Sequence, residues 1–114
     1  MKIEALLDQF LHASKRYGVY TIERNPRKAN QAYDDLYEIA LQLRESGDLE
    51  KLRTLLSYDD PATRMWAAVY LLVIDEKTAL PILEQISAEK SPFAFETRIS
   101  LEEWRKGNLK LFRD

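Results

Sequence analysis

Few residues of this sequence have the type and spacing that catalysis requires. His12 is the only histidine, and cysteine is absent. A general base needs a positioned partner and a nucleophile nearby, and His12 lies opposite the apolar stripe of the first predicted helix, facing solvent. The chain has three glycines and no phosphate loop, dinucleotide fingerprint or nucleophile elbow. We therefore expect a protein that is not an enzyme and needs no cofactor.

Carboxylates gather at two places. Asp34, Asp35 and Glu38 form one group, and Glu102 with Glu103 forms the other. Asp34 and Glu38 are one helical turn apart and can share a cation or a basic partner. Adjacent acids diverge by about 100 degrees around a helix, so neither adjacent pair converges easily on one site. We interpret both groups as solvated surface and expect no metal site.

Charge is unevenly distributed along the chain. Residues 1–30 carry six Lys or Arg and three Asp or Glu, whereas residues 31–60 carry three bases and eight acids. Residues 61–114 carry eight of each, and the net charge of the chain is -2. The acidic middle segment is the strongest asymmetry, and it indicates either a solvated helix face or a surface for a partner.

The bases near the amino terminus suggest nucleic-acid binding as an alternative function. Basic side chains hold phosphates, and tyrosines between them can stack on bases. The residues of this basic cluster are Lys15, Arg16, Arg24, Arg27 and Lys28, with Tyr17 and Tyr20 among them. The excess of acids over residues 31–60 would repel a polyanion, so we favour a protein partner.

Apolar residues recur at helical spacing, and no useful length of chain alternates apolar and polar residues as a strand would. We therefore expect an all-α fold, one domain over residues 1–114, with short connections. The first stripe runs from Ile3 to Tyr17, and Gly18 ends or bends that helix. Residues 19–22 fit either a further turn or an extended connection.

Polar caps, prolines and glycines mark the remaining helix boundaries. The starts and stops that they predict are Asn25-Pro26, Gly47, Asp60-Pro61, Ser91-Pro92 and Gly107. Asp48 is expected to cap a short third helix. The next helix after residue 74 begins at Asp75 or Thr78, because Pro81 is tolerated in a first turn and would break a helix interior.

Three helical faces have distinct chemistry. Met65–Ile74 is apolar all round and predicts a central buried helix, too short to cross a bilayer. The last helix is expected to place Phe95, Ile99, Leu101 and Trp104 inward. On the second helix a mixed flank of Asn30, Asp34, Tyr37 and Leu41 predicts either a second packing contact or an exposed site. The partner-binding surface that we expect there consists of Asn30, Asp34, Tyr37 and Glu38, with Tyr33 beside them.

The sequence also contains a degenerate repeat. Asn25-Pro26 and Asp60-Pro61 are both expected to open the first helix of a helix pair, and stacked pairs cover one another's apolar faces. The segment Asp60–Leu71, with its acidic cap, proline, arginine and paired alanines, resembles the first helix of a HEAT repeat. Together with Ala79–Glu84 and Phe95–Gly107, it resembles the bacterial family called domain of unknown function 2019, over roughly residues 26–109.

This resemblance implies a HEAT-like α-α superhelix and a bacterial origin, and it implies no activity. In HEAT repeats an arginine at the position of Arg64 ties neighbouring repeats together through an acid, and the candidate acids are Asp35, Asp59, Asp60 and Glu96. We expect structural roles, and not roles in binding, for Asp60, Arg64, Trp66 and Trp104.

We expect a protein-interaction module, an adaptor or an immunity protein that blocks a toxin, because small, acidic, cofactor-free helical proteins suit that role. Met1-Lys2-Ile3-Glu4 predicts no cleaved secretion signal, and the lack of cysteine fits a reducing cytoplasm. The oligomeric state is open, since either Leu41 or the C-terminal residues Leu109, Leu111 and Phe112 can form an exposed apolar patch.

Overall fold

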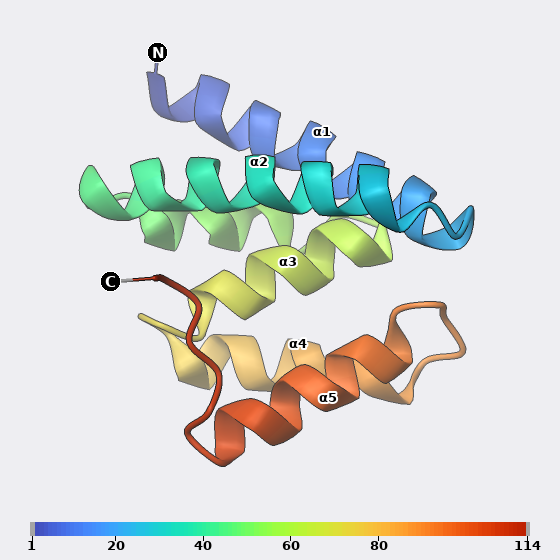
Figure 1. The fold of residues 1–114 in the computed structure, drawn as a ribbon. Coiled ribbons are helices and arrows are strands. Elements are labelled where there is room, and N and C mark those ends of the chain that lie inside the picture. The colour runs from blue at the N-terminus through green and yellow to red at the C-terminus, as the bar shows by residue number, and fades with distance from the viewer. Residues whose placement is uncertain (1, 114) are drawn as a thin grey trace.

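The computed structural model describes residues 2–113. Met1, one of the residues from which we predicted that there is no secretion signal, lies outside this range. The elements in chain order are α1 (Lys2–Ile22), α2 (Pro26–Glu45), the 3₁₀ helix η1 (Leu49–Leu55), α3 (Pro61–Leu71), α4 (Glu76–Ala88) and α5 (Ala94–Arg105) (Figure 1). No strand occurs within 2–113. The predicted all-α fold is confirmed. None of the helices in this range is long and apolar enough to span a membrane.

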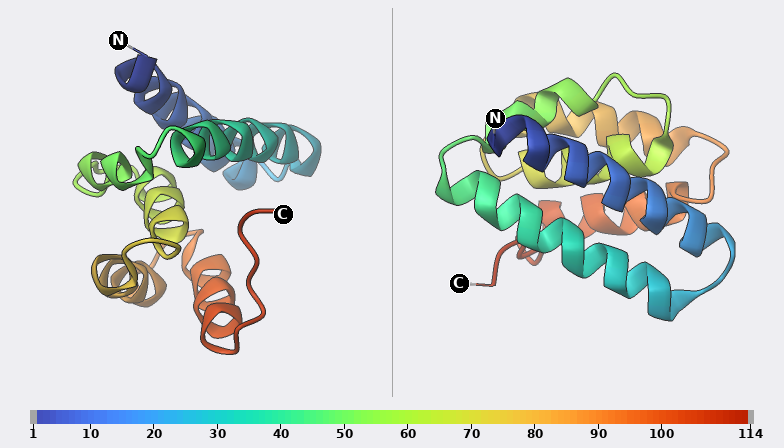
Figure 2. Two further views of the ribbon diagram at one scale, coloured as in Figure 1. Left: turned by 90° about the vertical axis from the view of Figure 1, so that its left-hand side faces the viewer. Right: turned by 90° about the horizontal axis from the view of Figure 1, so that it is seen from above.

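The helices form layers with α3 in the middle. The α1 and α2 helices pack along each other as a hairpin, η1 and α3 lie beneath them, and α4 and α5 form the far side (Figure 2). Because α2 packs on α1 and touches η1 only briefly, Asn25-Pro26 opens the second helix of a pair, contrary to the sequence prediction. After α5 the chain returns toward α2 as an irregular segment, residues 106–113, which we call the tail (Figure 2).

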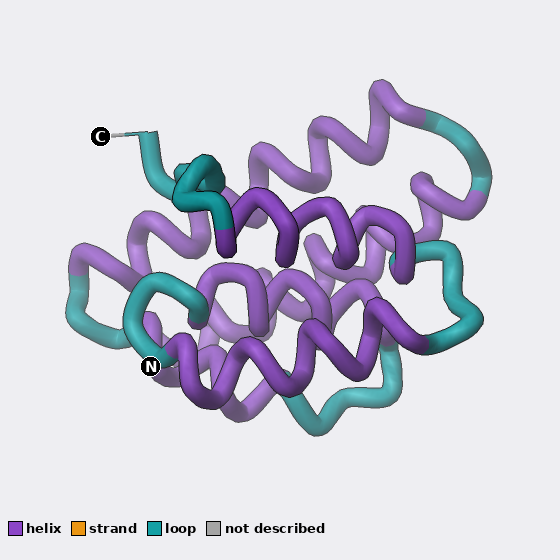
Figure 3. Tube along the Cα trace, turned by 90° about the horizontal axis from the view of Figure 1, so that it is seen from below, coloured by secondary structure: helices purple, strands orange, loops and turns teal. Residues whose placement is uncertain are grey.

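Helix starts and ends follow the predicted signals at most boundaries, and the loops are short (Figure 3). Asn25, Asp60 and Asp75 each accept a hydrogen bond from the backbone N–H three residues later, at 3.2, 3.0 and 3.4 Å. These bonds satisfy donors that the first turn of a helix leaves free. Gly47 and Gly107 have φ values of +78° and +77°, the left-handed conformation that ends a helix.

Gly18 does not end the first helix, because α1 continues to Ile22. A Cβ atom at Gly18 would lie 3.0 Å from the Cβ of Ala62 and 3.4 Å from Cζ of Phe93. The glycine therefore serves the close approach of α1 to the start of α3, and not a turn. Residues 19–22 form a further helical turn, one of the two predicted alternatives.

Two other boundaries differ from the prediction, those at Asp48 and at Ser91-Pro92. Asp48 makes no side-chain cap bond, and the helix after it is 3₁₀. The helix after residue 74 has Asp75 as its cap, one of the two predicted starts, but Pro81 lies inside it. Proline has no N–H to donate to the carbonyl of Lys77, and both residues are exposed. Ser91-Pro92 does not begin α5 directly: Ser91 Oγ accepts a bond from the N–H of Phe93 at 3.1 Å, and the helix starts at Ala94.

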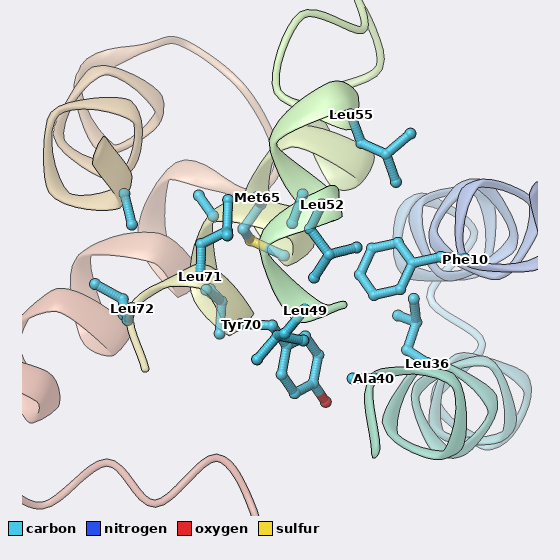
Figure 4. Packing of buried hydrophobic residues seen from close by; sticks show 14 of the residues in the cluster. Phe10, Leu36, Ala40, Leu49, Leu52, Leu55, Met65, Tyr70, Leu71 and Leu72 are labelled. Carbon is cyan, nitrogen blue, oxygen red and sulfur yellow. The ribbon is translucent and has the colours of Figure 1, made fainter. Parts of the chain in front are cut away.

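The core forms around α3. Met65 and residues 67–72 are all buried, as predicted. Figure 4 shows Phe10, Leu36, Leu52 and Tyr70 meeting between α1, α2, η1 and α3. The segment from Met65 to Leu72 is therefore central, and the cluster that it joins includes buried side chains of α1, α2, η1 and α4.

Two predicted burials are wrong at the margins of this core. Val73 and Ile74 follow the end of α3 and are 43% and 48% exposed. On α5, Phe95 and Ile99 are 67% and 45% exposed, because the helix turns a different face inward. The residues of that inner face are Ala94, Thr97 and Leu101.

Candidate functional site

Six aromatic side chains from distant parts of the sequence form one connected cluster. Successive ring centroids lie 5.2 to 6.1 Å apart, and Trp66 contacts three of the other rings. The members are Tyr17 of α1, Tyr33 and Tyr37 of α2, Trp66 and Tyr70 of α3, and Phe112 of the tail. We call this set the aromatic cluster. Phe10 of α1 adjoins this set through Tyr70, with ring centroids 6.2 Å apart, so side chains of α1, α2, α3 and the tail meet here.

Helical spacing places these rings. Tyr33 and Tyr37 are four residues apart on α2, and Trp66 and Tyr70 are four apart on α3, so each pair shares one helix face. The two faces meet because both helices also bury apolar neighbours in the common core. Tilted and edge-on ring pairs of this kind each contribute about 0.5–1.5 kcal/mol beyond the burial of their area.

The tail occupies one end of the aromatic cluster. The ring of Phe112 lies 6.0 Å from that of Tyr37 and 5.6 Å from that of Tyr70. The Arg113 guanidinium stacks 4.1 Å from the Tyr37 ring centroid, and the Arg113 N–H donates to the Tyr37 hydroxyl at 3.1 Å. Arg44 of α2 lies over Phe112 at 4.4 Å. An irregular polypeptide segment is thus held on α2 by aromatic and guanidinium contacts.

These contacts correct two sequence predictions. Tyr37, expected on an exposed partner surface, is only 6% exposed. Phe112 was expected in an exposed apolar patch and is also 6% exposed, while Leu41, Leu109 and Leu111 are partly buried against the core. The tail covers Tyr37, which the sequence pattern predicted to be exposed.

Glu96 lies at the other end of the cluster. The Tyr17 hydroxyl donates to both carboxylate oxygens of Glu96, at 2.7 Å from Oε2. Burial raises the pKa of the Glu96 carboxyl, and the bond from Tyr17 partly offsets that rise. Burial and the adjacent Glu96 raise the pKa of Tyr17 far above its ordinary value. Among residues 2–113, no ion pair joins Glu96 to a basic side chain.

Two buried donors at the centre of the cluster have no hydrogen-bond partner within 2–113. They are the Trp66 indole N–H and the Tyr70 hydroxyl. Burial raises the pKa of Tyr70 far above its usual range, and the neighbouring Tyr33 adds to this effect. Buried donors without acceptors are costly, by about 1–3 kcal/mol each. Most buried polar side-chain atoms in proteins have a hydrogen-bond partner, so these two donors are exceptions.

Only some residues of the predicted partner surface are exposed to solvent. Asn30, Asp34 and Glu38 are exposed on α2, and Tyr33 is partly buried against Trp66. Asn30 also lines a pocket of about 460 Å³ where α1 turns into α2. Tyr17 lines the same pocket, which therefore adjoins the Glu96 end of the cluster.

The basic cluster is exposed but does not present both of its tyrosines. Arg16 pairs with Asp35 at 3.0 Å, and the Lys28 ammonium lies 5.4 Å from the Tyr20 ring centroid. The hydroxyl of Tyr17 points to Glu96 and its ring packs on Trp66. Lys15, Arg24 and Arg27 are exposed, with Arg24 at the rim of the α1–α2 pocket. Nucleic-acid binding stays a prediction. Of the two tyrosines, Tyr20 is the one whose ring does not pack on Trp66 and could stack on a base.

Arg64 has an acidic partner on another helix pair, though not one of those predicted. It pairs with Glu89, after α4, at 3.4 Å, whereas Asp60 caps α3 through Thr63. Its buried Nε has no partner within the described chain. Trp104 donates from Nε1 to Glu76 and so ties α5 to the start of α4.

The candidate residues for catalysis lie on the surface. His12 is exposed, 4.0 Å from Asp8 across one helical turn. Glu102 pairs with Lys106 at 3.1 Å. Within residues 2–113 there is no group of three His, Asp or Glu side chains that could hold a metal ion. Asp34 and Glu38 are both exposed on α2.

Sequence reasoning missed the importance of Glu96 and of the tail. Glu96 entered only as one possible partner of Arg64, and Phe112 only as apolar surface. The two tyrosine and tryptophan pairs at four-residue spacing were a usable signal that α2 and α3 share an aromatic seam. Nothing local to residue 96 or 112 signals which helix it meets.

Comparison of this sequence and structure with protein-family models, with curated proteins and with solved structures finds no match in any of the three.

Proposed function

We propose that this chain is a HEAT-like stack of helix pairs that binds another protein through the α2 side of the aromatic cluster. The resemblance of Asp60–Leu71 to a HEAT helix supports the repeat architecture, and so does the layered packing around α3. Fold-level analogy then supports an interaction role. The absence of cysteine suits a reducing compartment, so the cytoplasm is the proposed location.

The observation that carries the proposal is the seating of the tail. An irregular segment already packs on α2 through an aromatic ring, a stacked guanidinium and a backbone N–H. The adjoining part of the same seam, around Tyr33 and Trp66, is partly exposed and is bordered by exposed Asn30 and Asp34. A partner segment that lies along α2 would continue the contacts which the tail begins.

Affinity capture from the native host tests this proposal. The variant Asn30→Ala/Asp34→Ala removes polar groups from the proposed surface. Its matched control, Gln31→Ala/Gln42→Ala, changes two exposed residues of the same helix on the side toward α1. We expect a captured protein that the first variant loses and the control retains. Identical recovery with both variants would reject the surface.

An immunity or adaptor role is the specific form of this proposal. It is supported by the exposed acids of α2 within the acidic segment 31–60, which suit a basic target. The resemblance to domain of unknown function 2019 adds a bacterial origin. Growth of cells that express the product of an adjacent gene, with and without this protein, tests the role: unchanged toxicity of every neighbouring gene product argues for the adaptor form.

A further inference from the structure

Glu96 is an acid without a countercharge. It is partly buried, its one side-chain donor is the neutral Tyr17 hydroxyl, and no basic side chain pairs with it among residues 2–113. Its position in the first turn of α5 supplies only the partial positive charge of a helix N-terminus. Taking a carboxylate out of water without a cation is unfavourable. A cation supplied from outside the chain would therefore stabilise the ionised carboxylate.

The ring of Tyr17, whose hydroxyl bonds to Glu96, contacts a group of rings that favours a particular kind of cation. Tyr17 stands edge-on to Trp66 at 5.2 Å, and Tyr33 is tilted against Trp66 at 5.3 Å. All three side chains keep part of their surface exposed. Aromatic faces attract cations, with tryptophan the strongest, and an adjacent carboxylate adds a hydrogen-bond acceptor.

The occupied end of the same seam shows which cation packs on such rings in this protein. Arg113 stacks on Tyr37 at 4.1 Å, and Arg44 stacks on Phe112 at 4.4 Å. Both are guanidinium groups, which are planar, weakly hydrated and able to bind a carboxylate through two donors. An ammonium group is a compact, strongly hydrated charge that gains less from a ring face.

We propose that Glu96, with Trp66 and Tyr33, forms a binding site for the guanidinium of an arginine side chain carried by the protein partner. The carboxylate accepts hydrogen bonds from the guanidinium while Tyr17 holds it in place, and the rings of Trp66 and Tyr33 pack against the cation. The chemistry of the site rests on the contacts of these four residues. The assignment of the arginine to a protein rests on the function proposed above.

A solution titration of the full-length protein tests the site. The probe is N-acetyl-arginine amide, followed through the two tryptophan indole N–H signals in ¹H–¹⁵N NMR spectra. We expect a saturable shift of the Trp66 signal. The Trp104 signal serves as an internal control, because its indole N–H donates to Glu76 at the start of α4 and not to a residue of the proposed site. N-acetyl-citrulline amide, neutral and nearly the same shape, should leave both signals unchanged.

Variants separate the two parts of the site. Glu96→Gln keeps the size of the side chain and an acceptor for Tyr17, and it should weaken arginine amide binding at least tenfold. Tyr33→Leu should weaken it about threefold, the loss of one exposed cation–ring contact. Far-UV circular dichroism confirms that each variant is folded. Equal shifts with arginine and citrulline, or unchanged affinity in Glu96→Gln, would overturn the proposal, as would lysine amide binding as tightly as arginine amide.

The outcome is distinguishable from that of the proposed function. If arginine amide binds as described but partner capture is the same for both α2 variants, the site stands and the partner surface on α2 falls. If citrulline matches arginine while capture depends on Asn30 and Asp34, the partner surface stands and the arginine site falls.

Discussion

The hydroxyl of Tyr17 on α1 donates to both carboxylate oxygens of Glu96 on α5, across 79 positions of sequence. The first and last helices of the chain are therefore joined directly, beside the central α3. Tyr17 also packs edge-on to the Trp66 ring, with ring centroids 5.2 Å apart, so one side chain contacts both Glu96 and Trp66. One contact thus fixes both the end-to-end packing of the stack and the orientation of the proposed binding group.

Tyr17→Phe should destabilise the protein by about 1–3 kcal/mol at neutral pH, since it leaves a partly buried carboxylate without its donor. The ring and its packing on Trp66 remain, so the loss reports the hydroxyl alone. Urea unfolding monitored by circular dichroism measures it. Tyr20→Phe is the control, and a loss as large in that variant would show that the effect is not specific to the bond with Glu96.

Glu96→Gln should make the protein more stable at pH 7. Burial raises the pKa of Glu96 in the folded state above its ordinary value of 4.5, so the folded state binds the proton more tightly than the unfolded state does. The stability that this group contributes is then fully present below pH 4.5 and is lost as pH rises through the folded pKa. Glutamine resembles the protonated acid at every pH.

Thermal unfolding at a series of pH values checks this sign. The melting temperature of Glu96→Gln should exceed that of the native protein at pH 7, and the two curves should converge toward pH 4. Glu50→Gln, an acid at the edge of η1, should follow the native curve. The opposite result would be a Glu96→Gln variant that melts below the native protein at pH 7 but not at pH 4. That result would mean that the folded state favours the ionised carboxylate.

Gly18→Ala should destabilise the protein by about 1 kcal/mol, although alanine favours an isolated helix by a similar amount. The added methyl would lie 3.0 Å from the Cβ of Ala62, an atom that cannot rotate away, and overpacking of this kind costs about 1–3 kcal/mol. A double-mutant cycle with Ala62→Gly measures the clash. Additive effects in that cycle would show that α1 and α3 can separate at no cost.

The helices themselves follow from local signals that are short in range. Asn25, Asp60 and Asp75 act as caps, and Gly47 and Gly107 as stops, because each depends only on backbone groups within a few residues. Gly18 and Pro81 defeat the same reasoning. The role of Gly18 is set by Ala62, 44 positions away, and Pro81 is tolerated because it lies with Lys77 on the exposed side of α4.

The candidate site was less predictable for a related reason. The α2 flank was found from its spacing, but Tyr37 is covered by a tail whose path no local pattern encodes. Glu96 looked like any surface acid in a first helical turn, and only the fold places it against Tyr17. Of the residues assigned inward on α5, Leu101 is buried, whereas Phe95 and Ile99 are exposed and Thr97, which was not assigned, is buried.

Phe112→Ala should cost about 3 kcal/mol and release the tail, because the buried ring is the main contact of this irregular segment with Tyr37 and Tyr70. Hydrogen exchange should accelerate at residues 108–113, including the Arg113 N–H that donates to Tyr37, with little change in α1. Lys110→Ala, an exposed change in the same segment, is the control. Unaltered protection of Arg113 in Phe112→Ala would show that the tail is held by other contacts.

Asp48 and Asp60 have the same sequence signature, an acid just before a helix, but different structural roles. Asp60 accepts from the N–H and the hydroxyl of Thr63, at 3.0 and 2.9 Å, whereas Asp48 makes no cap bond. Asp60→Ala should therefore cost about 1–2 kcal/mol, and Asp48→Ala less than about 0.5 kcal/mol. Thermal unfolding of the two variants in parallel provides the comparison. Equal losses would mean that charge near a helix start, and not the hydrogen bonds of Asp60, stabilises these two helices.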